Sequence, residues 1–185
     1  MKHYSFCLIE QEEQLLREDV RRVNKSEQVS IMPVYRFYNS RNGLQIIQPR
    51  MKSGNLKDLI TSKERPRFEK RMKLAKQVVH CISAAHSLRP PLLNLDLRSS
   101  NVLLGEEMEV VVDGFAGVSK LRNLNTNKSL FYESFKYCSP EILTGESHDE
   151  RSDVWSIGMR NICFFFMFQN SRLELFLSSL GDFLL

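Results

Sequence analysis

The sequence predicts an α+β fold with one packed domain, or slightly more. Two long segments repeat apolar residues at helical spacing, and several short runs rich in β-branched residues flank turn-forming Asn and Gly. The chain has 185 residues, of which 42% are hydrophobic. A chain of this size buries roughly two-thirds of its unfolded surface, which excludes disordered, collagen-like and disulfide-dependent miniprotein classes.

A helix followed by a small antiparallel sheet is expected near the N-terminus. Residues 11–23 repeat apolar side chains at helical spacing and carry charges on the opposite face. Residues 30–38 and 44–48 have the composition of strands. The Asn42-Gly43 pair between them accepts the positive φ values of a tight turn, which predicts a hairpin.

Two further helices are expected after a breaker-rich connection at residues 49–54, which is a candidate hinge. Residues 55–60 predict a short helix with Asn55 as its cap. Residues 68–86 give the strongest helical signal, and a Pro-Pro pair follows them. The expected buried face of this long helix consists of Met72, Ala75, Val79, Ile82 and Ala85.

A β-ribbon and a long loop complete the expected order. Residues 102–104 and 110–112 are short β-branched runs on either side of a Gly-containing turn. Residues 117–136 show no clear period and predict a long, mobile surface segment. The most apolar run, residues 162–168, is much shorter than the roughly 20 residues of a membrane span, so no transmembrane helix is expected.

Charge and cysteine spacing exclude several function classes. The chain has 26 Lys and Arg against 22 Asp and Glu, and its densest basic stretch, residues 63–76, also contains two glutamates. We therefore expect a solvated helix face there and no nucleic-acid binding. The four cysteines are far apart, which predicts neither a zinc site nor disulfides. Reduced thiols and the absence of a secretory pattern favour a cytoplasmic protein.

The segment with the clearest chemistry is Asn94-Leu-Asp-Leu-Arg-Ser-Ser-Asn101. Phosphoryl transfer needs a carboxylate to orient a hydroxyl nucleophile, a cation near the transferred phosphate and oxygen ligands for magnesium. Asp96 is the candidate for the first role, Arg98 for the second and Asn101 for the third.

This segment resembles the catalytic loop H-R-D-L-x-x-x-N of the protein-kinase-like superfamily, with matches at Asp96, Leu97 and Asn101. Three further similarities occur in the expected order: Ser53–Ile60 resembles the helix after the hinge, Ser139–Glu141 resembles A-P-E, and Asp153–Gly158 resembles the D-V-W-S-x-G start of the central helix.

The resemblance implies a bilobal protein-kinase-like fold with an incomplete N-lobe and a truncated helical C-lobe. Residues 1–52 are then a partial N-lobe, residues 53–159 a partial C-lobe, and residues 160–185 a divergent apolar tail. We expect self-association through this tail, as in a truncated product of a longer protein.

The cofactors that the resemblance implies are ATP and Mg²⁺, with binding expected to be weak or absent here. The implied nucleotide-binding residues are Pro49, Arg50, Met51, Asn101 and Asp113, and Asn101 and Asp113 are also the implied metal ligands.

Several departures from the kinase pattern affect the catalytic machinery. Asn94 and Leu95 stand where kinases have His and Arg. Gly114 occupies the position of the metal-binding Asp of D-F-G, and Asp113 lies one residue early. Because side chains alternate along a strand, either the ligand is lost or a local rearrangement returns the Asp113 carboxylate to the site.

The nucleotide side also departs from the pattern. Neither a G-x-G-x-x-G loop nor a V-A-I-K strand is present. Lys2 is the only lysine before Lys25 and is therefore the candidate remnant of the strand lysine. Its candidate helix partners are Glu12, Glu13 and Glu18, for which a solvated helix face is the alternative.

These observations favour a catalytically impaired pseudokinase that acts as a binding or signalling scaffold. The Gly114-Phe pair and the Arg-Ser-Ser-Asn loop are similar to those of mixed-lineage-kinase-domain-like pseudokinases and of tyrosine-kinase-like members. An active serine/threonine kinase that uses Asp96 as base, and a non-functional truncated product, remain the alternatives.

The resemblance also implies structural roles for four residues outside the loop. Asp153 is expected to brace the catalytic-loop backbone, and Trp155 to fill the core. His86 is expected to be a packed or hydrogen-bonded histidine. Glu141 lacks the late C-lobe Arg with which this glutamate pairs in the family, so we expect it to be buried with a raised pKa.

Overall fold

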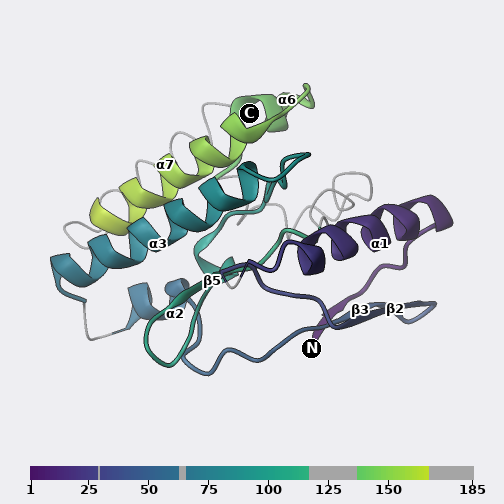
Figure 1. The fold of residues 1–185 in the computed structure, drawn as a ribbon, viewed down its shortest axis with the longest axis horizontal. Coiled ribbons are helices and arrows are strands. Elements are labelled where there is room, and N and C mark those ends of the chain that lie inside the picture. Colours follow the sequence, from purple (N-terminus) through teal and green to yellow (C-terminus); the bar gives the residue numbers. More distant parts are fainter. Residues whose placement is uncertain (29, 63–65, 117–136, 167–185) are drawn as a thin grey trace.

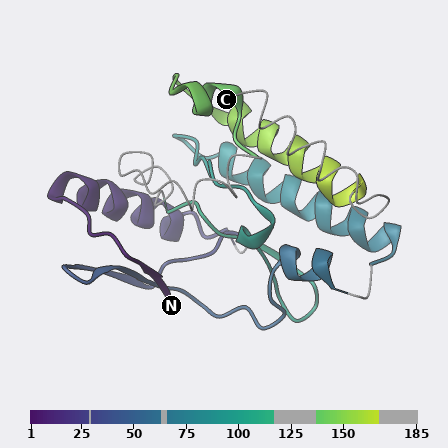
Figure 2. The ribbon, with the colours of Figure 1, turned by 180° about the vertical axis from the view of Figure 1, so that it is seen from behind.

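The computed structural model describes residues 1–28, 30–62, 66–116 and 137–166, with backbone only for 160–166. Figure 1 shows helices α3 (Phe68–His86) and α7 (Glu150–Phe166) side by side at one end of the molecule. Helix α1 (Glu10–Lys25) covers a small sheet at the other end, and the view from behind in Figure 2 shows the same arrangement. The fold is therefore α+β, as predicted.

The small sheet contains three antiparallel strands in the order β1-β3-β2. They are β1 (Lys2–Tyr4), β2 (Arg36–Ser40) and β3 (Gly43–Ile47). The predicted hairpin is confirmed, with Ser40 opposite Gly43 at its turn. Gly43 has a φ of 114°, and an added Cβ would clash with the backbone of Tyr4.

The first strand of this hairpin is shorter than the predicted 30–38. Ile31 instead forms a parallel bridge with Val112, and the Met32 amide donates to the Val112 carbonyl at 2.9 Å. Pro33 follows this bridge and cannot donate a backbone hydrogen bond, so the pairing with β5 ends there. The chain enters the three-stranded sheet only at Arg36.

Helix α1 packs on the sheet through Leu16, which is 1% exposed. Leu16 belongs to an apolar cluster with Leu8, Val34, Leu44, Ile46 and Ala116. The Asn24 side chain donates to the Val34 carbonyl at 2.7 Å and accepts from the Val34 amide at 3.0 Å. These two bonds fix the end of the helix against the chain that leads into β2.

The second apolar cluster surrounds α3. Helix α2 (Leu56–Thr61) precedes α3 and is capped as predicted, because the Asn55 side chain accepts from the Asp58 amide. The bounds predicted for α3 are confirmed, but its buried face is partly different. Its buried residues are Leu74, Ala75, Val78, Cys81, Ile82 and Ala85. Val79 is 44% exposed, because the face that meets the core is rotated toward Val78.

The predicted ribbon is confirmed as β4 (Val102–Leu104) and β5 (Val110–Val112), which follow the short 3-10 helix η1 (Ser99–Asn101). The Gln77 side chain of α3 donates to the Met108 carbonyl and accepts from the Val110 amide, which fixes the ribbon to the helix.

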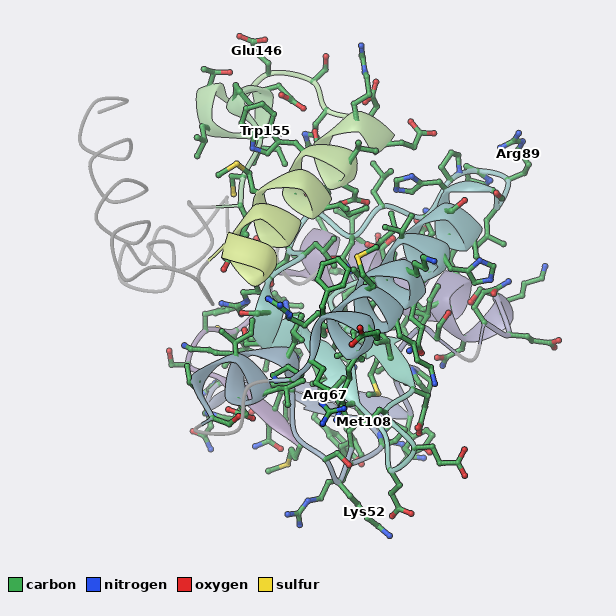
Figure 3. The ribbon with its side chains drawn as sticks, turned by 90° about the vertical axis from the view of Figure 1, so that its left-hand side faces the viewer. Lys52, Arg67, Arg89, Met108, Glu146 and Trp155 are labelled. Atoms are coloured by element: carbon green, nitrogen blue, oxygen red, sulfur yellow. The ribbon has the colours of Figure 1, made fainter. Side chains whose placement is uncertain are left out.

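Helix α6 (Pro140–Thr144) leads into α7, which carries the predicted Trp155. The expectation that Trp155 fills the core is wrong, because its side chain is 45% exposed. Figure 3 shows Trp155 and Glu146 at the end of the molecule opposite Lys52 and Met108. The predicted surface segment 117–136 and the side chains of the apolar tail lie outside the described residues.

Candidate active site

A buried aspartate on α7 holds the backbone before Asp96. Asp153 is fully buried and accepts from the amides of Asn94 at 2.9 Å and Leu95 at 2.7 Å. It also lies 2.9 Å from His86 Nε2. Leu95 has a φ of 57°, a left-handed conformation that costs free energy in a side chain of this size. The expected roles of Asp153 as a brace and His86 as a hydrogen-bonded residue are confirmed.

The three candidate catalytic residues lie together on the loop that follows. Asn101 Nδ2 donates to both the carbonyl and the carboxylate of Asp96, at 2.8 and 2.9 Å. Arg98 Nε lies 3.4 Å from Asp96 Oδ1, and both side chains are mostly buried. The loop thus presents a carboxylate that is already hydrogen-bonded and ion-paired.

Asn94 connects this loop to Asp113. The Asn94 side chain is fully buried, donates to the Asp113 carbonyl at 2.9 Å and accepts from the Asp96 amide at 3.2 Å. The Asp113 amide donates in turn to the Asn101 carbonyl at 2.8 Å. The residue that replaces the family's His therefore fixes two candidate carboxylates relative to each other.

The Asp113 carboxylate faces the same pocket as Asp96. It forms an ion pair with Lys2 of β1 and accepts from Gln48 Nε2 at 3.0 Å and from the Gly114 amide at 2.7 Å. Gly114 has a φ of 104°, and a Cβ there would lie 3.3 Å from the Asn94 amide group. The Asp113 carboxylate therefore lies in the site, as the rearrangement alternative requires, and a left-handed Gly114 permits this position. Its role as a metal ligand stays a prediction.

Lys2 lies on β1 and lines the pocket, but its ion-pair partner differs from the expected one. Its carboxylate partner is Asp113 and not one of the α1 glutamates considered from the sequence. Partial burial of the Lys2 ammonium lowers its pKa, but the nearby Asp113, with smaller effects from Tyr4 and Asp96, outweighs this and raises the pKa above its ordinary value.

The pocket between these groups is small. Its volume is about 30 Å³, enough for about two water molecules. Ten described residues line it: Lys2, Tyr4, Ile46, Gln48, Asp96, Arg98, Asn101, Asp113, Gly114 and Ala116. The structure thus brings together the four candidates Asp96, Arg98, Asn101 and Asp113. The other three, Pro49, Arg50 and Met51, follow Gln48 in the connection to α2 and are not among the lining residues.

Comparison with known proteins identifies the family. The profile of the protein kinase domain matches residues 4–174. The chain belongs to the protein kinase domain family. Lys2 lies just before the matched range, so its place in the site comes from the structure alone.

Curated kinases are similar at low identity. MDIS1-interacting receptor like kinase 2 of Arabidopsis thaliana is 24% identical over 76% of this chain and 14% of its own length. Serine/threonine-protein kinase PLK4 of Drosophila yakuba is 26% identical over 77% of this chain and 18% of its own. A probable LIM domain-containing serine/threonine-protein kinase of Dictyostelium discoideum is 32% identical over 59% of this chain and 16% of its own. The chain therefore spans less than a fifth of each of these relatives.

A kinase domain generally uses magnesium, and the two implied ligands, Asn101 and Asp113, both line the pocket. Magnesium binds in octahedral geometry to one or two carboxylates together with phosphate and water oxygens. The described residues hold no group of three His, Cys, Asp or Glu side chains that could bind a metal ion, so phosphate and water would complete the coordination. Asp113, the implied ligand, already has an ammonium as its partner.

The expectation for Glu141 is wrong. Its side chain is not buried, and the hydroxyl of Ser152 donates to its carboxylate at 2.5 Å. This hydrogen bond, with weaker ones from its own amide and from Ser139, lowers the pKa of Glu141 instead of raising it. The partner of Glu141 among the described residues is thus a serine on α7.

Two of the polar contacts in the site could not be predicted from the sequence. Gln48 follows a strand and has an ordinary composition around it, so nothing in the pattern predicted its bond to Asp113. Asn94 was recognised only as a departure, although a buried amide that bonds on both sides is a structural link.

None of the described helices is long and apolar enough to span a bilayer.

Proposed function

We propose that this kinase domain is a catalytically impaired pseudokinase that acts as a binding or signalling module. The observation that carries the proposal is the pairing of each pocket carboxylate with a pocket cation, Asp113 with Lys2 and Asp96 with Arg98. An active kinase needs its cations for phosphate and its carboxylates for metal and substrate.

Charge and volume both support this proposal. The described lining of the pocket carries two carboxylates and two cations, so it has no excess of charge to attract either Mg²⁺ or a triphosphate. Pockets for small molecules usually have a volume of about 300 Å³ or more and are largely preformed. A pocket of about 30 Å³ would have to open, and both ion pairs would have to separate, before a nucleotide could bind.

An active serine/threonine kinase is the second candidate, and one observation favours it. Asn101 holds Asp96 by two hydrogen bonds, and the backbone before Asp96 is fixed by Asp153. This is the arrangement in which a carboxylate can accept a proton from a substrate hydroxyl. One intact loop is insufficient, because positioning and electrostatic stabilisation provide most of the acceleration of phosphoryl transfer.

Transfer of radiolabelled phosphate from ATP to peptides with Ser, Thr or Tyr tests the two candidates. The chain is compared with Asp96→Asn and with Asp149→Asn, an aspartate on the surface that pairs with Arg151. We expect equal background in all three proteins. Turnover that Asp96→Asn abolishes and Asp149→Asn preserves would establish an enzyme and contradict the pseudokinase proposal.

The remaining expectations belong to the same proposal. Residues 1–52 and 53–159 act as the two lobes, which is supported by two apolar clusters, one mainly of the first range around Leu16 and one mainly of the second around α3. Val23 and Ile31 join the second cluster and Ala116 joins the first. The domain is cytoplasmic, as the wide spacing of its cysteines favours, and its role as a binding module implies protein partners.

A further inference from the structure

One face of the three-stranded sheet is not covered by any described helix. In Figures 1 and 2, α1 lies on one side of this sheet, where Leu44 and Ile46 of β3 pack in the same apolar cluster as Leu16 of α1. Because side chains alternate along a strand, the residues next to Leu44 and Ile46 point to the opposite face. We call this opposite face the open face of the sheet.

The strand register shows which residues meet on the open face. His3 of β1 and Tyr38 of β2 both pair with Gln45 of β3, so these three residues form one row across the sheet. Arg36 pairs with Ile47 in the next row, and its guanidinium donates to the Tyr38 hydroxyl at 3.3 Å. Tyr38 is 46% exposed, and Arg36 is exposed as well. The open face therefore presents an aromatic ring beside a cation.

The sequence that forms this face is basic and has no carboxylates. Residues 28–57 contain five Arg and Lys and no Asp or Glu, although the chain has 22 acidic residues in total. Within the described part of the chain, neither Arg36 nor Arg41, which lies in the turn after β2, is paired with a carboxylate. A guanidinium without a carboxylate partner offers a planar fork of donors that fits a carboxylate by two parallel hydrogen bonds.

The separation of the two arginines restricts the partner that could bind both. Arg36 begins β2 and Arg41 follows its last residue, so their Cα atoms are about 15 Å apart, at about 3.3 Å per strand residue. An extended peptide spans this distance when its carboxylates are about four or five residues apart. A side chain between the two carboxylates would then lie over the ring of Tyr38.

Two arginines on one face favour a protein partner over a nucleic acid or a lipid surface. Proteins that bind DNA often contact about 6–10 phosphates, and lipid-binding segments gather about 4–8 Lys and Arg. The other three basic residues of 28–57 lie in the connection to α2 and in α2 itself. Tyrosine and arginine are the residue types that contribute most to protein–protein binding.

We propose that the open face, through Arg36, Tyr38 and Arg41, is the docking surface for an extended acidic segment of a partner protein. Two carboxylates of the segment bind the two arginines, and an apolar side chain between them packs on the Tyr38 ring. The inference rests on the proposed function and deepens it, because it gives the chemistry of the partner that the binding module recognises.

A fluorescent peptide that has two glutamates about five residues apart, with a leucine between them, is the probe, and anisotropy with the full chain measures its binding. We expect Arg36→Gln and Arg41→Gln each to weaken binding about five- to tenfold, because each removes a charge-assisted, bidentate contact. Arg36→Lys keeps the charge without the fork and should lose part of the affinity. Arg21→Gln, which removes an exposed arginine of α1, is the matched control and should leave binding unchanged.

A second peptide of the same composition, with its two glutamates adjacent, should bind at least about fivefold more weakly, because it can reach only one arginine. Three results would overturn the proposal: no binding of the first peptide at millimolar concentration, equal binding of the two peptides, or an equal loss in Arg21→Gln and Arg36→Gln.

Competition experiments distinguish the protein partner from other anionic partners. A single-stranded oligouridine or vesicles of phosphatidylserine and phosphatidylcholine should not displace the peptide at concentrations equal to its own. Displacement by either would overturn the proposal in favour of a nucleic-acid or lipid surface. Because none of these measurements involves ATP or phosphate transfer, failure of the docking surface is distinguishable from failure of the proposed function.

Discussion

Replacement of Asp153 by Ala should destabilise the chain strongly, since this one carboxylate satisfies two buried amides. Asp153 accepts from the amides of Asn94 and Leu95 and contacts His86. A buried donor left without a partner costs about 1–3 kcal/mol, so two orphaned amides predict a loss of about 2–6 kcal/mol in the free energy of unfolding. For a chain of this size that corresponds to a fall of about 5–20 °C in the thermal midpoint.

Urea and thermal unfolding followed by circular dichroism would measure this loss. Asp149→Ala is the control at the N-terminus of the same helix, because the exposed Asp149 carboxylate pairs with Arg151 and accepts from its amide, and its loss should cost about 1 kcal/mol. If Asp153→Ala does not fold, Asp153→Asn keeps one acceptor oxygen and should lose about 1–3 kcal/mol. An Asp153→Ala chain as stable as Asp149→Ala would refute the assignment of Asp153 as the brace.

Three other changes have defined outcomes. Gly114→Ala should lower the free energy of unfolding by about 1–3 kcal/mol, because φ is 104° at this position. A variant with the same free energy of unfolding in a urea titration would contradict the left-handed backbone at Gly114. Ser152→Ala should raise the pKa of Glu141, which an NMR titration of the carboxyl group would measure. With the serine present, the lowered pKa of Glu141 stabilises the fold at neutral pH, and this contribution is lost as the pH falls through that pKa. Burial, with a smaller effect of Asp96, raises the pKa of the Cys138 thiol to about 11, so alkylation mapped by mass spectrometry at about pH 8 should modify the exposed Cys7 well before Cys138; equal rates would exclude a buried thiol.

The order and type of the elements could be predicted because local patterns determine them. Helix α3 begins and ends at the predicted residues, since its apolar period is long and a Pro-Pro pair follows. The capping of α2 by Asn55 depends only on neighbouring residues. The exact buried face of α3 could not be predicted, because Val78 and Val79 are equally apolar and only the packing partners distinguish them.

The candidate site was predicted where the sequence carries a motif and missed where distant strands meet. Asp96 and Asn101 are five residues apart on one loop, and their bond follows from that loop. The ion pair of Lys2 and Asp113 joins a residue of β1 to the residue that follows β5, and the two are far apart in the sequence. It depends on the pairing of β1 with β3 and on the left-handed backbone at Gly114, and neither is encoded in a short pattern.

The thermal midpoint of the unaltered chain with and without magnesium-ATP tests most directly whether its two ion pairs keep the site closed. A ligand present at its own dissociation constant stabilises a protein by only about 0.4 kcal/mol, and weaker binding gives less. We therefore predict a shift of no more than about 1–2 °C at millimolar ATP, the same with and without Mg²⁺. A magnesium-dependent shift of many degrees that Asp113→Ala abolishes would contradict the closed site and favour a kinase with Asp113 as its metal ligand.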